Sequence, residues 1–222
     1  MTKLGGRATM TDIVHGPEHD LTRRRIQQRL LNRVRTGRVK GVMIATPCHT
    51  LSRARRGCPP PLRTNEFPWG LSGLSTVDCE KVRVGNVLTR FTIKLICLCL
   101  KMRIPCIVEN PLTSMFWILP EVVRLLALPQ VKLERMDFCQ FGTRWRKATR
   151  FMLCNIPDDV CRTLESFKCT GRGVCSRSGR AHLELSGKAP NGKFWTLIAQ
   201  PYPPRLCKKL AEVFHACHLS RG

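Results

Sequence analysis

The stretch GVMIATPCHTLSRAR, residues 41–55, decides how the rest of the chain is interpreted. Val39 to Ala45 is short and mostly apolar, which predicts a buried strand. This strand leads directly into Thr46-Pro47-Cys48-His49. Later in the chain, Ile104 to Val108 is a second short apolar segment, and it ends at Glu109-Asn110-Pro111. The sequence therefore predicts two strands that each end in residues capable of chemistry.

Helical patterns surround these two strands. Four helices are predicted, over Asp20 to Gly37, Asp78 to Lys101, Ser114 to Leu128 and from Pro203-Pro204 onward. Asp20 or Thr22 is expected to cap the first, and Pro120 to kink the third or to start a new helix. Two more strands are predicted over Val131 to Asp137 and Arg150 to Ile156. This alternation predicts an α/β fold with a mostly parallel sheet, helices on both faces, and Val39 to Ala45 beside Ile104 to Val108.

In sheets of this kind, ligands bind beyond the carboxyl ends of the strands. Pro47-Cys48 and Glu109-Asn110 both fall at such ends. We therefore expect them to face one cleft.

The charge of the chain is large and clustered. The net charge of the 222 residues is +23, and hydrophobic residues make up 43%, enough for a real core. Between Leu21 and Asn65 there is no acidic residue, while twelve positions are Arg or Lys. This indicates a polyanionic partner, and we expect nucleic acid. A membrane surface is the weaker alternative, because no basic amphipathic helix has a wide aromatic face.

The thirteen cysteines are irregularly spaced, and several lie inside apolar segments. Such cysteines are typical of reduced, buried thiols in an intracellular protein. The sequence begins without a signal-peptide pattern, and no apolar segment approaches membrane-spanning length. We therefore expect an intracellular location, nuclear rather than cytoplasmic.

Cys48 and Glu109 are the candidate catalytic residues. A partly exposed thiol near Arg38, Arg53, Arg55, Arg56 and Arg63 would have a lowered pKa and act as a nucleophile; the alternative is a structural cysteine. Glu109 would be partly desolvated and able to donate a proton, or it caps the next helix. His49 is either a base or simply a loop histidine.

Two further patterns lie in the second half of the chain. FGTRWRKATR, residues 141–150, interleaves cationic and aromatic residues, which suits phosphate contact with base stacking, or is simply a basic hairpin. Cys169, Cys175 and His182 could supply three metal ligands, with Cys161 or Cys154 as a fourth. Because the spacing does not match closely paired cysteines, no metal site is assigned, and zinc remains an open alternative.

Taken together and in order, these segments resemble the cytosine-C5 DNA methyltransferases. That family has a strand ending in Pro-Cys with a Ser shortly after, a later strand ending in Glu-Asn, and a Tyr-Gly-containing hairpin with basic residues. Here these are Pro47-Cys48 with Ser52, Glu109-Asn110, and DFCQFGTRWRKATRFMLCN, residues 137–155. AQPYPPRLCKKLAEVF, residues 199–214, resembles the closing helix of the family. The methyltransferase-like domains beside eukaryotic mobile elements look closer still.

The resemblance implies a Rossmann-like methyltransferase sheet and covalent catalysis. Cys48 would add to C6 of a flipped cytosine, Glu109 would hold the N3 side of the base, and carbon-5 would take a methyl group from S-adenosylmethionine. Asp12 and Asp20 would touch the ribose and adenine of this donor, with Pro47 and Asn110 completing its site. Basic residues from Arg23 to Arg63 and in the hairpin would contact the phosphates. The DNA-binding residues named within these segments are Arg53, Arg55, Arg56, Arg144, Arg146, Lys147 and Arg150.

The resemblance also suggests a division of the chain. Residues 1–19 form an irregular segment, 20–156 the methyltransferase-like core, 157–198 a small Cys-containing insert, and 199–222 a helix that packs back on the core. No strand and glycine-rich turn precede Asp12, so we expect a sheet incomplete at the N-terminus and a fragment that transfers methyl groups poorly or not at all. The alternatives are a non-catalytic nucleic-acid-binding protein with the same scaffold and a small basic zinc-binding interaction protein.

Overall fold

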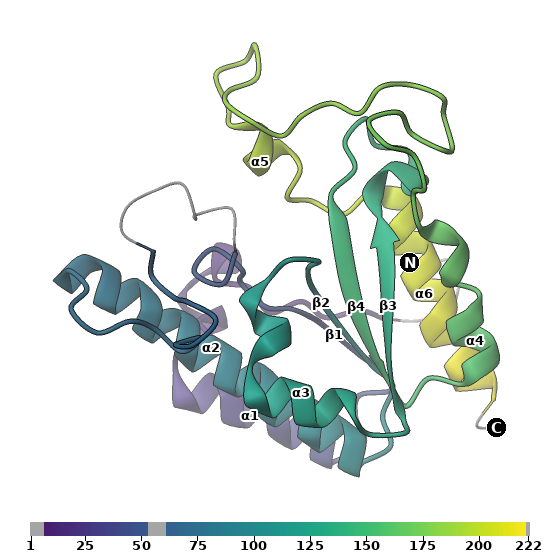
Figure 1. Ribbon diagram of the computed structural model, residues 1–222. Coiled ribbons are helices and arrows are strands. Elements are labelled where there is room, and N and C mark those ends of the chain that lie inside the picture. The colour runs from purple at the N-terminus through teal and green to yellow at the C-terminus, as the bar shows by residue number, and fades with distance from the viewer. Residues whose placement is uncertain (1–6, 53–60, 221–222) are drawn as a thin grey trace. The chain divides into compact units, whose positions relative to one another are not determined.

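The structure is a computed structural model that describes residues 7–52 and 61–220 (Figure 1). The chain divides into two compact units. We call the described residues of Ala8–Leu133 with Met152–Ile156 the N-terminal unit, and the described residues of Glu134–Phe151 and of 157–220, with Arg7, the C-terminal unit. The boundary between them crosses the last two strands, so the tip of their hairpin belongs with the C-terminal part of the chain.

A four-stranded sheet has the order β1-β2-β4-β3. Its strands are β1 (Val42–Ala45), β2 (Cys106–Pro111), β3 (Val131–Asp137) and β4 (Ala148–Cys154). β1 and β2 are parallel, with Val42 opposite Cys106 and Ala45 opposite Glu109. The predicted pairing of the two apolar segments is therefore confirmed, and the protein has an α/β fold.

The prediction of a mostly parallel sheet is wrong. β1 and β2 form the one parallel pair, and the other pairings are antiparallel. The connection between β3 and β4 covers only residues 138–147. That is too short for a crossover, which takes about a dozen residues or more, so the two strands form a hairpin. The helix-strand alternation that predicts parallel strands ends after residue 131.

The helices of the N-terminal unit are α1 (Arg24–Arg35), α2 (Thr76–Lys101) and α3 (Pro120–Leu126), with short 3-10 helices at Ile13–His15, Pro17–His19 and Met115–Ile118. α2 begins after Ser75, whose side chain accepts a hydrogen bond from Asp78 N. Pro120 starts α3, as one of the two expected outcomes, because proline fits the first helical position. α1 begins after Arg23 without a side-chain cap, so the predicted capping role of Asp20 and Thr22 is wrong.

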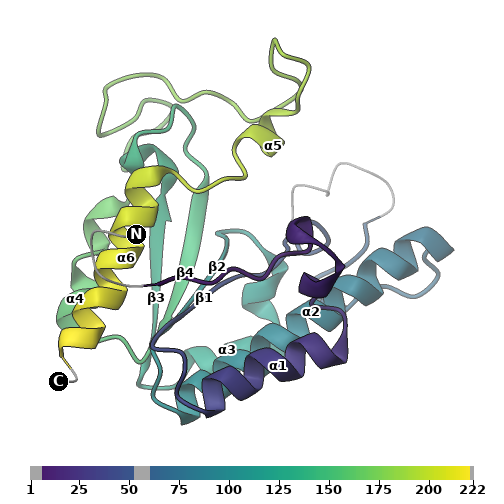
Figure 2. The ribbon, with the colours of Figure 1, turned by 180° about the vertical axis from the view of Figure 1, so that it is seen from behind.

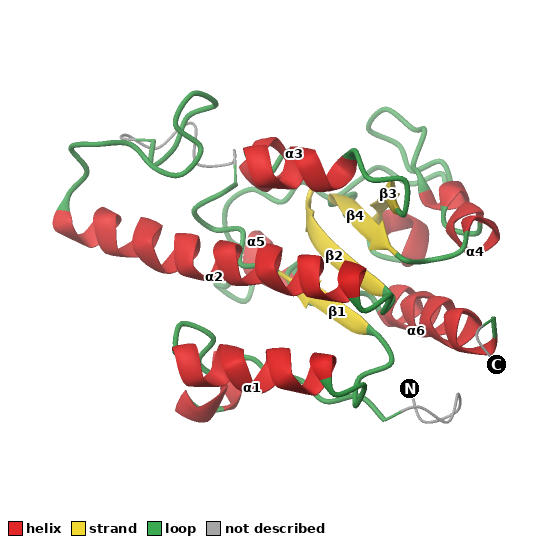
Figure 3. Cartoon of the chain, turned by 90° about the horizontal axis from the view of Figure 1, so that it is seen from below, coloured by secondary structure: helices red, strands yellow, loops and turns green. Residues whose placement is uncertain are grey.

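The core of the N-terminal unit is large and apolar. α1 packs against α2, which in turn packs against β2; Figure 3 shows the two helices side by side. Fully buried side chains from each layer meet there, including Leu31, Ile96, Val108, Phe116 and Leu119. Burial of this kind stabilises a unit by about 1.5–3 kcal/mol for each large apolar side chain.

The C-terminal unit contains less regular structure (Figure 2). Its α-helices are α4 (Asp158–Arg162), α5 (Trp195–Ile198) and α6 (Pro204–Leu219), with 3-10 helices at Phe138–Phe141 and Glu165–Phe167. α6 packs against Phe138–Phe141, and the rings of Phe138 and Tyr202 meet edge to face. Between Lys168 and Phe194 the chain has only isolated bridges, Val174 with Ala181 and Lys188 with Phe194. No helix among the described residues is long and apolar enough to span a bilayer.

Candidate functional site

The predicted nucleophile Cys48 lies in a loop that is tied to β2 and α2. The parallel register places Ala45, the last residue of β1, opposite Glu109. Just beyond it, Thr46 O accepts a hydrogen bond of 3.0 Å from the buried Asn110 side chain. Thr46 Oγ1 lies 2.8 Å from Thr92 Oγ1 on α2, at a buried position. The start of the loop is therefore fixed before the chain reaches Cys48.

A tight turn follows immediately. Leu51 N and Ser52 N both donate to Cys48 O, at 2.9 and 2.7 Å. Leu51 is fully buried, and its carbonyl accepts from Met115 N at 2.8 Å. Cys48 is half-buried and its thiol is not part of a disulfide. The geometry therefore presents a partly exposed thiol on a well-anchored backbone.

Arg63, one of the cations expected near Cys48, is a buried anchor of this turn. It is 5% exposed, and its guanidinium donates to Thr50 O at 3.0 Å and to Thr50 Oγ1 at 3.1 Å. Its other bonds go to Pro68 O at 2.9 Å and Asn86 Oδ1 at 2.8 Å. Burial lowers the pKa of Arg63 to about 10, so it stays charged at neutral pH. It links the Pro-Cys loop to α2 through neutral oxygen atoms.

Gly85 of α2 makes this close approach feasible. A Cβ at this position would lie 2.5 Å from Thr50 Oγ1 and 3.1 Å from the Arg63 guanidinium. Any side chain would push the turn away from the helix. The sequence shows this only as a glycine inside a helical pattern.

Glu109 and Asn110 lie at the end of β2 and are both buried, Glu109 at 7% and Asn110 at 0% exposure. Because parallel strands have their carboxyl ends at one edge, Glu109 and the Pro47-Cys48 loop lie at the same edge of the β1–β2 pair. Asn110, which was expected in the donor site, uses its amide nitrogen to hold Thr46. Its observed contact is therefore a positioning one.

The predicted ribose and adenine contacts, Asp12 and Asp20, lie in local turns. Asp12 is exposed, and Asp12 Oδ1 accepts from Val14 N at 3.1 Å, capping the first 3-10 helix. The Asp20 carboxylate accepts from Thr22 N and Thr22 Oγ1, and these hydrogen bonds lower its pKa. In residues 7–52 the first strand is β1, so no described strand leads into either aspartate. Pro47, the fourth predicted donor contact, is exposed.

The predicted nucleic-acid contacts fall into two groups. Arg53, Arg55 and Arg56 lie outside the described residues. In the hairpin, Arg144 is exposed, whereas Arg146, Lys147 and Arg150 are half-buried. Arg146 donates to Cys169 O at 2.8 Å and to Gly171 O at 3.2 Å, and Lys147 Nζ lies 4.5 Å above the Phe138 ring. Arg146 therefore has a structural role within the C-terminal unit.

α1 presents a basic surface within the range from Arg23 to Arg63, whose basic residues were expected to contact phosphate. Arg24, Arg25, Arg29 and Arg35 are exposed, while Ile26, Leu31 and Val34 form the buried face. Within the described part of the chain, no acidic side chain forms an ion pair with Arg24 or Arg25. The polar face of this helix carries mostly arginine.

The structure brings Cys169, Cys175 and His182 together, with Cys139 as a fourth member instead of Cys161 or Cys154. Burial raises the pKa of Cys139 to about 12. Burial also raises the pKa of Cys169 and of Cys175, but hydrogen bonds outweigh it. Hydrogen bonds, first among them those with Ser176, lower the pKa of Cys169 to about 7. Hydrogen bonds, first among them those with Ser178, lower the pKa of Cys175 to about 6. The spacing of the cysteines in the sequence did not indicate Cys139, because it lies in the β3–β4 hairpin and is distant along the chain from the other three residues.

A cavity of about 630 Å³ lies against Arg63, Phe67, Leu71 and Met115. Among the described residues that line it, neither Cys48 nor Glu109 is present. We therefore place no substrate in it.

The chain matches no protein-family model, and no curated protein and no solved structure is significantly similar to it.

Proposed function

We propose that the N-terminal unit binds nucleic acid and attacks the cytosine ring with Cys48, in the manner of the cytosine-C5 methyltransferases. One observation carries this proposal. Ala45 lies opposite Glu109 in the parallel register, and Asn110 donates a hydrogen bond to Thr46 O. These two contacts support the placement of the Pro-Cys loop and Glu109 at the same edge of the sheet. The antiparallel hairpin that follows leaves this pair of strands unchanged.

The chemistry requires a nucleophile and a proton-bearing group on one base. The Cys48 thiolate forms a bond to C6, and the electron pair of the C5–C6 double bond moves to C5 and the ring carbonyl system. A proton then adds to C5, and reversal of the steps expels the thiolate. Glu109, desolvated at the strand end, holds the N3 side of the base and stabilises the charge that develops there. The base must first leave the helical stack, at a cost of a few kcal/mol.

S-adenosylmethionine, the donor that the resemblance implies, would supply the methyl group. The described residues fit it poorly, because Asp20 already accepts hydrogen bonds from Thr22 and Asp12 caps a local turn. We therefore derive only the steps between Cys48 and the base.

The nucleic-acid partner is supported by charge. The net charge is +23, and the exposed arginines of α1 offer sites for phosphate contact. Such contacts position a protein on its nucleic acid but carry no sequence information.

The test is exchange of the C5 hydrogen, which needs no methyl donor. DNA containing cytosine tritiated at C5 is incubated with the protein, and tritium release into water is measured. Cys48→Ser should abolish the release, and Glu109→Gln should slow it by roughly 10²–10⁴-fold, the usual contribution of acid–base catalysis. Cys97→Ser, at an exposed cysteine of α2, is the matched control and should release tritium normally.

A second function is favoured by the poor fit of the donor: a nucleic-acid-binding protein without catalysis. Salt-dependent DNA binding by the folded protein, with no tritium release, would reject the catalytic proposal and support this one. Equal release by the unmodified chain and Cys48→Ser would reject the role of Cys48.

A further inference from the structure

We propose that Cys139, Cys169, Cys175 and His182 bind one zinc ion in a closed structural site of the C-terminal unit. Their four ligand atoms all lie within 4.8 Å of one another. The three cysteines are buried and are free thiols. Three thiolates and one imidazole form a donor set that is common in structural zinc sites.

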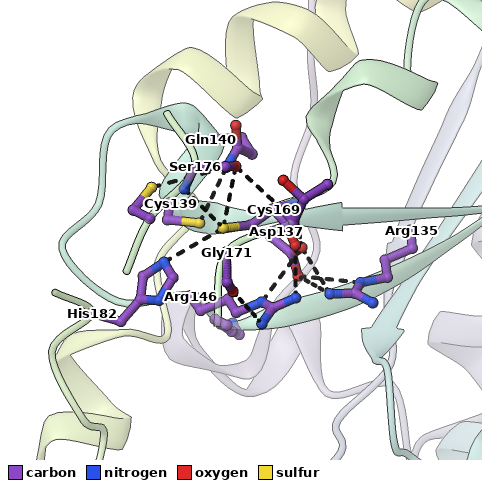
Figure 4. Close-up of polar contacts among 12 residues, drawn as sticks. Arg135, Asp137, Cys139, Gln140, Arg146, Cys169, Gly171, Ser176 and His182 are labelled. Atoms are coloured by element: carbon purple, nitrogen blue, oxygen red, sulfur yellow. Dashed lines mark hydrogen bonds and ion pairs between the residues drawn. The ribbon is translucent and has the colours of Figure 1, made fainter. Parts of the chain in front are cut away.

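The separations agree with tetrahedral coordination. Zinc bonds of ~2.3 Å to sulfur and ~2.0–2.1 Å to nitrogen separate two sulfurs by roughly 3.8 Å, and a sulfur from a nitrogen by roughly 3.6 Å. The observed distance from Cys169 Sγ to His182 Nε2 is 3.7 Å. Figure 4 shows the Cys139 and Cys169 thiols and the His182 imidazole directed toward one point. Small movements from the present positions would complete the tetrahedron.

The chain between Cys169 and His182 is folded by short-range contacts that bring its two ends together. His182 N donates to Gly173 O at 2.7 Å, beside the bridge between Val174 and Ala181. Gly171 must be glycine, because a Cβ there would lie 1.7 Å from Val174 O. These contacts form a compact loop with a ligand at each end.

A second set of bonds connects Cys175 to the turn after it. Cys175 N donates to Arg180 O, and Gly179 N donates to Cys175 O, both at 2.8 Å. Gly179 adopts a left-handed conformation, with φ of 66°, that favours glycine. The turn holds the middle ligand of the three in the same small region as the other two.

Polar groups around the cluster are placed to support thiolates. Ser176 N and Ser176 Oγ both lie 3.5 Å from Cys169 Sγ, and Gln140 Nε2 lies 3.5 Å from Cys139 Sγ. The buried Asp137 carboxylate accepts from Cys169 N at 2.7 Å. Outer hydrogen bonds of this kind orient the ligands of a metal and stabilise their charged forms.

The site joins the tip of the β3–β4 hairpin to the loop at 168–182. Arg146 of the hairpin donates to Cys169 O and Gly171 O, and Leu183 N donates to Arg144 O at 2.9 Å. Because all four ligands come from the protein and three are buried, no position is left open for a substrate. The ion would act as a structural staple, independent of any catalysis by Cys48.

The experiment measures metal in the full-length protein, purified under reducing conditions from zinc-supplemented cells. We expect one zinc per chain by elemental analysis. After exchange into cobalt, we expect the visible absorption of tetrahedral Co²⁺ with thiolate ligands. Folded protein that contains no zinc and shows no such absorption would overturn the proposal, as would iron in place of zinc.

Four variants test the ligand set. Cys139→Ser should lose the bound zinc, whereas Cys161→Ser, at another buried cysteine of the same unit, should keep it. His182→Cys should also keep it, because a fourth thiolate preserves tetrahedral coordination, and this covers the case in which the serine variant fails to fold. Zinc retained by Cys139→Ser, or lost in Cys161→Ser, would contradict the assignment. Cys48→Ser should keep its zinc, which separates this test from that of the proposed function.

Discussion

Two regions of the chain, the N-terminal unit and the segment from 168 to 194, achieve order by different means. The N-terminal unit has a continuous apolar core in which residues such as Phe116 and Leu119 are fully buried. In the segment from 168 to 194 of the C-terminal unit, regular structure is limited to isolated bridges, and a buried cluster is formed by Cys139, Cys169 and Cys175. A segment that buries little apolar surface needs another source of stability, which a metal site provides. The comparison teaches that one chain can combine a region held by apolar packing with a loop that the proposed zinc site would hold.

Removal of the metal should produce the largest difference in stability between the two regions. A zinc chelator should abolish hydrogen-exchange protection of amides from 169 to 182, because their loop loses the ion that joins its ends. Amides of α2 and β2 should keep their protection. Hydrogen exchange followed by mass spectrometry measures both. Equal loss in the two regions would show that they are not independently stabilised, and unchanged protection of 169–182 would remove the structural role of the metal.

The next effect concerns the loop that carries Cys48. Arg63→Met should destabilise the N-terminal unit by roughly 2–4 kcal/mol, because it removes a buried charged donor and leaves Thr50 O and Asn86 Oδ1 without it. Urea unfolding, followed by a probe in this unit, measures the change. Arg83→Ala, at an exposed arginine of α2, is the control and should leave the free energy of unfolding nearly unchanged. Equal effects of the two variants would contradict the anchoring role of Arg63.

A smaller effect is expected around the metal. Ser176→Ala removes the hydroxyl near Cys169 Sγ but keeps the backbone N–H bond, so zinc affinity should fall by about 10-fold. Competition with a chromophoric chelator gives the affinity. Ser186→Ala, at an exposed serine outside the cluster, should bind zinc like the unmodified chain. An unchanged affinity in Ser176→Ala would mean that the outer hydrogen bonds do not stabilise the thiolate.

The smallest expected effect is on the salt dependence of DNA binding, and it compares the basic surface of α1 with that of the β3–β4 hairpin. Replacing Arg24 and Arg25 by Ala should lower the slope of log affinity against log salt by about 2, since each arginine releases roughly one counterion on binding DNA. Arg146→Ala should weaken zinc binding and leave this slope nearly unchanged, because Arg146 is bonded to Cys169 O and Gly171 O. DNA binding titrated at several salt concentrations measures the slope. The opposite pattern would place the interface on the hairpin.

The sequence by itself determined much of the local structure. Apolar periodicity located α1, α2, α3, α6 and the four strands but neither α4 nor α5, and β3 covers the residues predicted for it, Val131 to Asp137. It also predicted the pairing of β1 with β2 and the common edge at which Pro47-Cys48 and Glu109 lie. These features can be predicted because the spacing of apolar residues within a segment indicates both its secondary structure and the face that it buries.

Only the tertiary structure decided the antiparallel pairing of β4 with β2, the burial of Arg63 and the membership of Cys139 in the cluster. Each depends on which distant residues meet. An arginine among other arginines in a loop gives no sign that neutral oxygen atoms of Thr50, Pro68 and Asn86 will surround it. Likewise, a cysteine in a hairpin shows no local spacing to ligands that a separate loop brings to it. The sequence determines which side chains are present. The tertiary fold determines the distances between side chains that are remote along the chain, and these distances decide whether the side chains can act together.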